Sequence, residues 1–156
     1  MNITHPAHQE MLAALLEYKV DFILVGGYAV IFHGYVRTTG DMDVWLRPTE
    51  ENKIKLMEVF TQLKFNPGDI KIIEKLNFSD VVIFHIGEEP ERIDFLTRIE
   101  GLNFDEAFSR KVFLKLENYK FPVLMYDDLI TSKIVTGRLK DKADVEQLIK
   151  VRKDKR

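Results

Sequence analysis

The feature that most constrains the fold is a run of four apolar residues, Phe22-Ile-Leu-Val25, that ends at Gly26-Gly27. A run this short and wholly apolar is typical of a buried strand, and paired glycines stop it. The next residues, from Tyr28 to His33, have a helical pattern that ends at Gly34, a common C-terminal stop. The chain is therefore expected to pass from a buried strand directly into a helix.

The rest of the chain alternates helical and strand-like patterns. The first helix is expected at 6–18, with Thr4 as its cap. A second begins at Thr49, buries Ile54, Met57, Phe60 and Leu63, and stops at Asn66-Pro67-Gly68. Further helices are expected at 103–110, from a cap at Asp127 to Gly137, and at 141–152. Strands are expected at 43–47, 81–86, 92–97, 112–116 and 121–125, and a polar turn joins 81–86 to 92–97 as a hairpin. This order predicts one α+β domain over residues 1–156, with a mixed β-sheet flanked by helices.

The composition excludes several classes of protein. An apolar fraction of 46% excludes a disordered chain, and the lack of cysteine excludes disulfides and thiolate metal sites. Lys and Arg number 23 against 25 Asp and Glu, a balance that argues against a protein that coats nucleic acid. No segment approaches the roughly 18 apolar residues of a membrane span, and the N-terminus does not resemble a signal peptide. A cytoplasmic protein without membrane contact is expected.

Asp41-Met-Asp43 stands at the entrance to the strand expected at 43–47. Side chains two apart on a strand point to one face, roughly 7 Å apart along it. Two carboxylates so placed repel each other in a partly buried site unless a cation lies between them. Mg²⁺ suits this place, because it prefers oxygen ligands and keeps positions open for phosphate oxygens. The pattern alone also arises by chance in solvated loops, so it needs support from other residues.

Asp94 lies inside the apolar strand Ile93-Asp-Phe-Leu96. A carboxylate in such a strand is costly to bury without a partner. Two interpretations are open: Asp94 pairs with Arg92, two residues earlier on the same face, or it is a third metal ligand beside Asp41 and Asp43.

Gly26-Gly27 also allows two interpretations. Residues without Cβ let the backbone approach a ligand closely, and the N–H groups of the following helix could face a phosphate. The same pair also serves as a tight turn with no ligand. Neither a P-loop nor a G-x-G-x-x-G pattern is present.

Taken together, the segments FILVGGYAVIFHG, TTGDMDVWL and ERIDFLT resemble the polymerase-β-like nucleotidyltransferases. The run KIVTGRLKDKAD, from Lys133 to Asp144, looks like the C-terminal helical motif of minimal nucleotidyltransferases in the branch of the AbiEii-type toxins and the antibiotic nucleotidyltransferases. The resemblance covers about residues 20–150. One departure is that many members have Gly-Ser where this chain has Gly26-Gly27, which removes a hydroxyl near the phosphates.

The resemblance implies an enzyme that transfers a nucleoside monophosphate from an NTP to an acceptor hydroxyl and releases pyrophosphate. It implies that Asp41 and Asp43 bridge two Mg²⁺ ions and that Asp94 binds the catalytic one, with Mn²⁺ as a substitute metal. Lys133 is expected to bind the triphosphate with Arg138 behind it, and to do so from the edge of a helix where its loss leaves the fold intact. Nucleotide contacts are expected from Gly26, Gly27, Thr39, Lys133 and Arg138, with Arg37 in the same loop as Thr39.

The acceptor stays open among an RNA end such as that of tRNA, a protein hydroxyl as in toxin–antitoxin pairs, and a small molecule such as an antibiotic. A core this short leaves little chain for an acceptor lobe, so a homodimer or a partner protein is expected to complete the cleft. The alternative is a catalytically weak, nucleotide-binding regulatory module that acts through a partner protein. Three clustered carboxylates favour the enzyme, because a binding module has no physical need for them. A receiver-like signalling domain fits poorly, since the acidic strands come with a hairpin.

Overall fold

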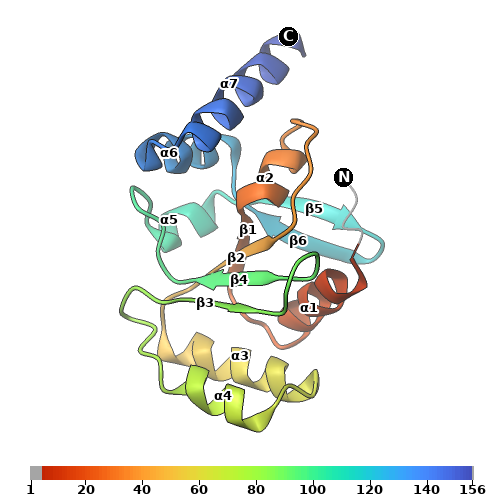
Figure 1. Cartoon of the computed structure of the whole chain (residues 1–156), viewed down its shortest axis with the longest axis vertical. Helices are drawn as coiled ribbons and strands as arrows, with labels where there is room; N and C mark the ends of the chain where they lie inside the picture. Colours follow the sequence, from red (N-terminus) through yellow and green to blue (C-terminus); the bar gives the residue numbers. More distant parts are fainter. Residues whose placement is uncertain (1–4, 156) are drawn as a thin grey trace.

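The computed structural model describes residues 5–155 of the chain (Figure 1). It contains the helices α1 (Pro6–Glu17), α2 (Gly26–Phe32), α3 (Glu50–Gln62), α4 (Pro67–Glu74), α5 (Phe104–Ser109), α6 (Tyr126–Thr136) and α7 (Leu139–Asp154). Its strands are β1 (Phe22–Val25), β2 (Met42–Leu46), β3 (Ile83–Ile86), β4 (Ile93–Leu96), β5 (Val112–Leu116) and β6 (Tyr119–Val123).

The strands form one sheet in the order β3-β4-β2-β1-β6-β5. β1 pairs antiparallel with β2 and parallel with β6, while β2 pairs parallel with β4. The two outer pairs, β3 with β4 and β5 with β6, are antiparallel hairpins. The sheet is therefore mixed, and the α+β fold class predicted from the sequence is confirmed.

The two faces of the sheet are covered by different helices. On one face, Phe60 of α3 packs edge-on against Phe95 of β4, with ring centroids 5.7 Å apart. On the other face, Trp45 of β2 meets Phe104 of α5 at 5.2 Å. Helices α6 and α7 pack together near α2, at the opposite end of the molecule from α3 and α4 (Figure 1). This arrangement leaves the N-terminal end of β2 close to α2.

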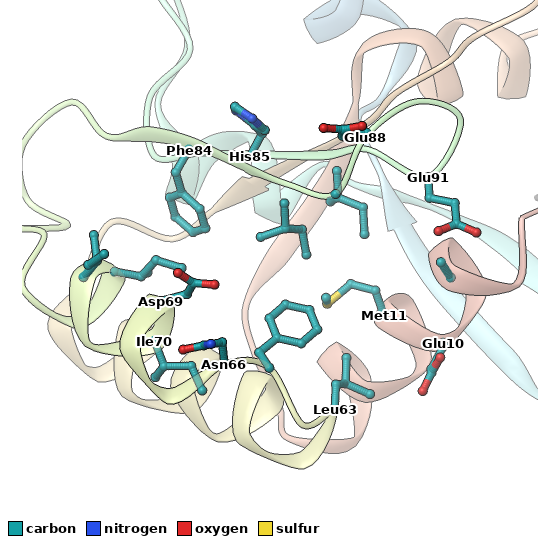
Figure 2. A pocket seen from close by; sticks show the side chains of 17 residues that line it. Glu10, Met11, Leu63, Asn66, Asp69, Ile70, Phe84, His85, Glu88 and Glu91 are labelled. Atoms are coloured by element: carbon teal, nitrogen blue, oxygen red, sulfur yellow. The ribbon is translucent and has the colours of Figure 1, made fainter.

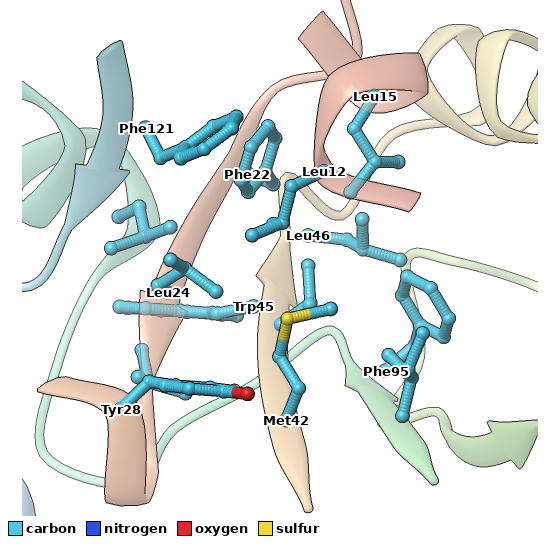
Figure 3. Packing of buried hydrophobic residues seen from close by; sticks show 14 of the residues in the cluster. Leu12, Leu15, Phe22, Leu24, Tyr28, Met42, Trp45, Leu46, Phe95 and Phe121 are labelled. Atoms are coloured by element: carbon cyan, nitrogen blue, oxygen red, sulfur yellow. The ribbon is translucent and has the colours of Figure 1, made fainter. Parts of the chain in front are cut away.

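The hydrophobic core lies around β1 and β2, whose apolar side chains are buried on both faces of the sheet (Figure 3). Leu12 and Leu15 of α1 lie over Phe22 and Leu46, and all four side chains are fully or almost fully buried. Burial of β1 on both faces explains its uninterrupted apolar sequence. The strand that carries Asp43 is thus held firmly in the centre of the molecule.

Several element boundaries differ from those predicted. Asn66-Pro67 does not only end a helix, because Asn66 accepts a hydrogen bond from the Gly68 N–H and so caps the new helix α4. In α3, Thr49 is the N-cap as predicted, but Ile54 is 59% exposed and Leu56 is buried instead. The cap of α6 is Met125, which places Asp127 in the first turn. The cap predicted at Thr4 lies outside the described residues.

Among residues 5–155, no helix is both long enough and apolar enough to cross a membrane.

Candidate active site

The three aspartates predicted as metal ligands lie at one end of β2 and β4. Asp43 and Asp94 are register partners on these neighbouring parallel strands, so their side chains leave the sheet on the same face. Asp41 directly precedes β2, and the three carboxylates are close enough for Asp94 and Asp41 to raise the pKa of Asp43. The juxtaposition that the Asp-x-Asp spacing and the later strand aspartate predict is therefore present.

The electrostatics of this cluster are unfavourable for full ionisation. Burial, followed by the charges of Asp94 and Asp41 and a hydrogen bond with Asp94, raises the pKa of Asp43 to about 6. One oxygen of Asp41, Oδ1, is buried without a hydrogen-bond partner among the described residues. Arg92 donates a hydrogen bond from Nε to Asp94 Oδ1 at 2.9 Å, so the pairing considered for Asp94 exists alongside its place in the cluster.

These features fit a divalent cation with oxygen ligands. The unpartnered Asp41 oxygen and the raised pKa of Asp43 both mark a site short of positive charge. As the side chains stand, no three acidic or histidine side chains in the part of the chain described here are grouped closely enough to hold a metal ion.

Gly26 and Gly27 bring the start of α2 against this cluster. Gly26 has φ +62, and a Cβ placed there would lie 2.0 Å from Asp43 Oδ2. A Cβ on Gly27 would lie 2.4 Å from Thr39 Oγ1, which donates a hydrogen bond to the Asp41 carbonyl. The glycine pair is therefore required by close contact with Asp43 and Thr39, and Thr39 occupies the space that a serine at position 27 would use.

Lys133 lies in a buried ionic network, not on a solvated helix face. Its side chain in α6 is 9% exposed, and Nζ lies 3.0 Å from carboxylate oxygens of both Asp141 and Asp144 of α7. The Lys133 charge acts on Asp43, where it lowers the pKa. Lys133 therefore lies near the aspartate cluster, with its ammonium fixed between two carboxylates.

Arg37 and Arg138 join this network from opposite sides. Arg37 Nε lies 3.2 Å from Asp144 Oδ1, which ties the loop that contains Thr39 to α7. Arg138 donates to Asp141 Oδ2 at 2.7 Å, but its side chain is 71% exposed. Although burial acts against it, hydrogen bonds from Thr136, Lys133 and Arg138 lower the pKa of Asp141 to about 2. Of the two cations predicted to bind phosphate, Lys133 is buried and Arg138 is largely exposed.

Asp141 and Asp144 are structural partners of the site to which the sequence assigned no role. Both are almost fully buried, at 2% and 3% exposure. Their spacing of three residues places them on one helix face, and two acids on a helix beside a lysine in the preceding helix are the signal that could have revealed them. The contact between Arg37 and Asp144 joins residues 107 positions apart, and no local pattern predicts it.

His8 of α1 contacts α2 and the residue that precedes β4. It is 1% exposed, and its ring nitrogens lie 2.7 Å from Tyr28 Oη and 3.2 Å from the Arg92 carbonyl. Burial is the main cause of its lowered pKa. His8 thus ties α1 to α2 and to the start of β4.

The chain resembles known proteins in its fold and in its sequence family. No curated protein resembles the sequence closely enough to count as a relative. The fold is similar to that of a Thermotoga maritima protein assigned to the nucleotidyltransferases, with a TM-score of 0.57 and 12% identity over 92% of this chain and 90% of that one. For the lincosamide antibiotic adenylyltransferase LnuA in its lincomycin-bound form, the TM-score is 0.49 and the sequence identity is 17%, over 95% of this chain and 98% of that one. This likeness is too low to carry a conclusion.

Residues 3–152 match the sequence family described as nucleotidyltransferases of unknown function (DUF6036), which spans nearly the whole chain. The resemblance to nucleotidyltransferases predicted from the motifs is thereby confirmed. The chain belongs to this family and is a nucleotidyltransferase.

Proposed function

We propose that the chain transfers a nucleoside monophosphate from an NTP to an acceptor hydroxyl in a Mg²⁺-dependent reaction, with Mn²⁺ as a substitute. The observation that carries the proposal is the pairing of Asp43 with Asp94 on neighbouring strands, with Asp41 beside them. In this reaction the acceptor oxygen forms a bond to the α-phosphorus while the bond to pyrophosphate breaks. Bound Mg²⁺ would neutralise the negative charge on the attacking and leaving oxygens.

Asp41, Asp43 and Asp94 would hold the metal. Asp43 is fixed by β2, and Asp94 by β4 and by Arg92. Asp94 is also our candidate to take the proton of the acceptor hydroxyl. The closeness of Gly26 to Asp43 Oδ2 leaves no room for a side chain between the carboxylate and the start of α2. The NTP phosphates would therefore lie against backbone at Gly26 and Gly27.

Lys133 is proposed to compensate the charge of the triphosphate as pyrophosphate leaves. Its ammonium is fixed by Asp141 and Asp144, so it needs little reorganisation when phosphate arrives. Thr39 and Arg37 line the same side of the site, next to Gly27. Arg138 is proposed as a second, outer contact, because its side chain is largely exposed while its Nε remains bound to Asp141.

The test is transfer of label from each of the four α-labelled NTPs, with Mg²⁺, to three acceptor pools: tRNA, protein from a lysate, and small hydroxyl-bearing antibiotics. Labelling of one pool by the wild type and not by Asp43→Asn is expected. This substitution keeps the shape of the side chain and removes its charge. The absence of labelling in all three pools would contradict the proposed transfer.

A second candidate is a catalytically weak, nucleotide-binding module that acts through a partner, as in a toxin–antitoxin pair. It is favoured by one observation, that Lys133 and Asp94 already have ionic partners within the chain. Isothermal titration separates the two. The enzyme needs Mg²⁺ or Mn²⁺ for NTP binding and loses binding in Asp43→Asn, whereas equal binding by both proteins in EDTA supports the module.

A further inference from the structure

A groove lies on the face of the sheet opposite the aspartate cluster, between α1, α4 and β3 (Figure 2). Its volume is about 850 Å³, within the range of binding sites for ligands and side-chain anchors. The floor is apolar and includes Met11, Leu63, Phe84 and Ile86. None of these residues takes part in the proposed nucleotide transfer, so the proposed function does not account for the groove.

The rim of this groove carries one sign of charge. Glu10, Asp69, Glu88 and Glu91 surround the apolar floor from three different segments (Figure 2). Of the lining residues, all within the described part of the chain, none is lysine or arginine. An apolar floor inside a ring of carboxylates is complementary to an occupant with an apolar anchor flanked by cations. We call this feature the acidic groove.

The same chain carries a surface with the complementary pattern. On the outer face of α7, Ile149 is 41% exposed, and its neighbours Lys150 and Lys153 are exposed. Lys153 is four residues from Ile149 and three from Lys150, so it lies beside both of them, and the exposed Glu146, three residues before Ile149, is an acid at the edge of this group. Arg152 is not counted, since it lies over the Tyr126 ring and near Asp127. We call Ile149, Lys150 and Lys153 the basic face of α7.

We propose that the acidic groove of one molecule binds the basic face of α7 of a second copy, with Ile149 in the groove and the two lysines on its carboxylate rim. α7 extends from one end of the molecule, whereas α4 and the groove lie towards the other end (Figure 1). The two surfaces therefore cannot meet within one chain. A contact between unlike surfaces is heterologous, so it continues from molecule to molecule or closes into a ring.

The contact is small and strongly charged, which sets its expected behaviour. Such contacts are weak, so association should become visible at roughly 50–500 µM protein. Salt screens exposed charges, and roughly 0.5 M NaCl should therefore return the protein to monomers. Neither surface includes Asp41, Asp43 or Asp94, so self-association is independent of nucleotide transfer.

The experiment is sedimentation velocity on the full chain with paired charge reversals. Glu10→Lys with Glu88→Lys leaves the groove rim without net charge, because Asp69 and Glu91 remain, and Lys150→Glu with Lys153→Glu reverses the basic face. Each double variant alone is expected to stay monomeric. An equal mixture should form dimers and nothing larger, because only one productive contact is left between the two variants. The chain that carries all four substitutions should stay monomeric, because its groove rim has no net charge and its α7 face is acidic.

Glu58→Lys with Glu100→Lys, two exposed acids outside the groove, gives the matched control with the same change in net charge. This control should associate like the wild type. Circular dichroism melts identify any variant that fails to fold, and Ile149→Ser then tests the same contact without a charge change. A wild type that stays monomeric at all concentrations would overturn the proposal and leave the groove to a basic helix of another protein. Association that survives both reversals would overturn it as well.

Discussion

Asp43 has Asp94 beside it on β4 and Asp41 two residues earlier, and burial with these two charges raises its pKa to about 6. In the unfolded chain the same carboxyl ionises near its ordinary value of 3.8. The folded state therefore holds this proton more tightly, so stability from this group is present at low pH and is lost as the pH rises towards and above 6. The contribution of Asp43 to the stability of the metal-free protein should be smallest at the pH where the site is fully charged.

The first prediction is that Asp43→Asn stabilises the metal-free protein at high pH. The pKa difference corresponds to about 3 kcal/mol at pH 8 and roughly half of that at pH 5. Urea unfolding in EDTA at both pH values measures it. Burial lowers the pKa values of His8 and His33, so their contribution to the free energy of unfolding falls as the pH falls. This contribution is the same in both proteins and cancels in the comparison. A variant no more stable than the wild type at pH 8 would show that burial and the neighbouring carboxylates do not disfavour the charged form of Asp43 in this way.

The second prediction concerns Gly26. In Gly26→Ala, the new Cβ would overlap Asp43 Oδ2, which it would approach to 2.0 Å, so the carboxylate must move. A displacement of about 1 Å can lower a rate by about 100-fold, and we expect a loss of that order in kcat/KM. Gly137→Ala is the matched control, since Gly137 has φ +67 and no atom within 4 Å of the added Cβ. It should have the same backbone strain and keep its activity, and equal losses in both variants would contradict the steric argument.

At the residue level, the sequence predicts where the three aspartates lie better than it predicts the residues that surround them. The positions of Asp41, Asp43 and Asp94 follow from a spacing of two on a strand and from the cost of an acid inside an apolar strand. The ion pairs of Lys133 with Asp141 and Asp144 cannot be predicted from local spacing. They depend on how α7 packs against α6 and on the contact of Asp144 with Arg37, in a loop more than a hundred residues away. Local patterns cannot specify such distant pairings.

At the level of elements, most of the predicted helices and strands are present, and the error at α4 has a clear cause. Asn-Pro ends one helix and, through the Asn66 side chain and the fixed φ of proline at the first position, begins another. The sequence supports both interpretations equally. α4 packs against α3 and buries Ile73, a tertiary contact that the local sequence pattern does not predict.

The third prediction belongs to the pair of helices α6 and α7. Because Lys133 Nζ is held between Asp141 and Asp144, Lys133→Ala leaves two buried carboxylates undercompensated. We expect a loss of about 3 kcal/mol in the free energy of unfolding, measured with urea, and at least a ~10-fold loss of transfer by the folded fraction. The structure thus replaces the expectation that this substitution leaves the fold intact.

Lys53→Ala separates stability from catalysis in this test. Lys53 is also buried, and its Nζ donates to the carbonyls of Glu74 and Leu76, away from the aspartate cluster. It should lose stability and keep activity per folded molecule. Full activity in folded Lys133→Ala would remove Lys133 from the site.

For the whole molecule, ligand binding and stability are linked through the central position of β2. This strand is buried in the middle of the sheet, and it carries Asp43 at one end. Occupation of the site should therefore stabilise the entire cooperative unit and not only a loop. The fourth prediction follows from that link.

Mg²⁺ with the preferred NTP should raise the free energy of unfolding of the wild type by about 2.7 kcal/mol at a ligand concentration 100 times its Kd. The same NTP in EDTA should give little stabilisation, because the three carboxylates repel a bare triphosphate. Asp43→Asn should show no Mg²⁺-dependent increase, although it starts from a more stable metal-free state. Arg47→Ala, which removes ion pairs with Asp21 and Asp105 outside the site, should start less stable and gain as much as the wild type. Thermal melts of the three proteins measure these shifts, and an equal gain in Asp43→Asn would place the nucleotide site away from β2.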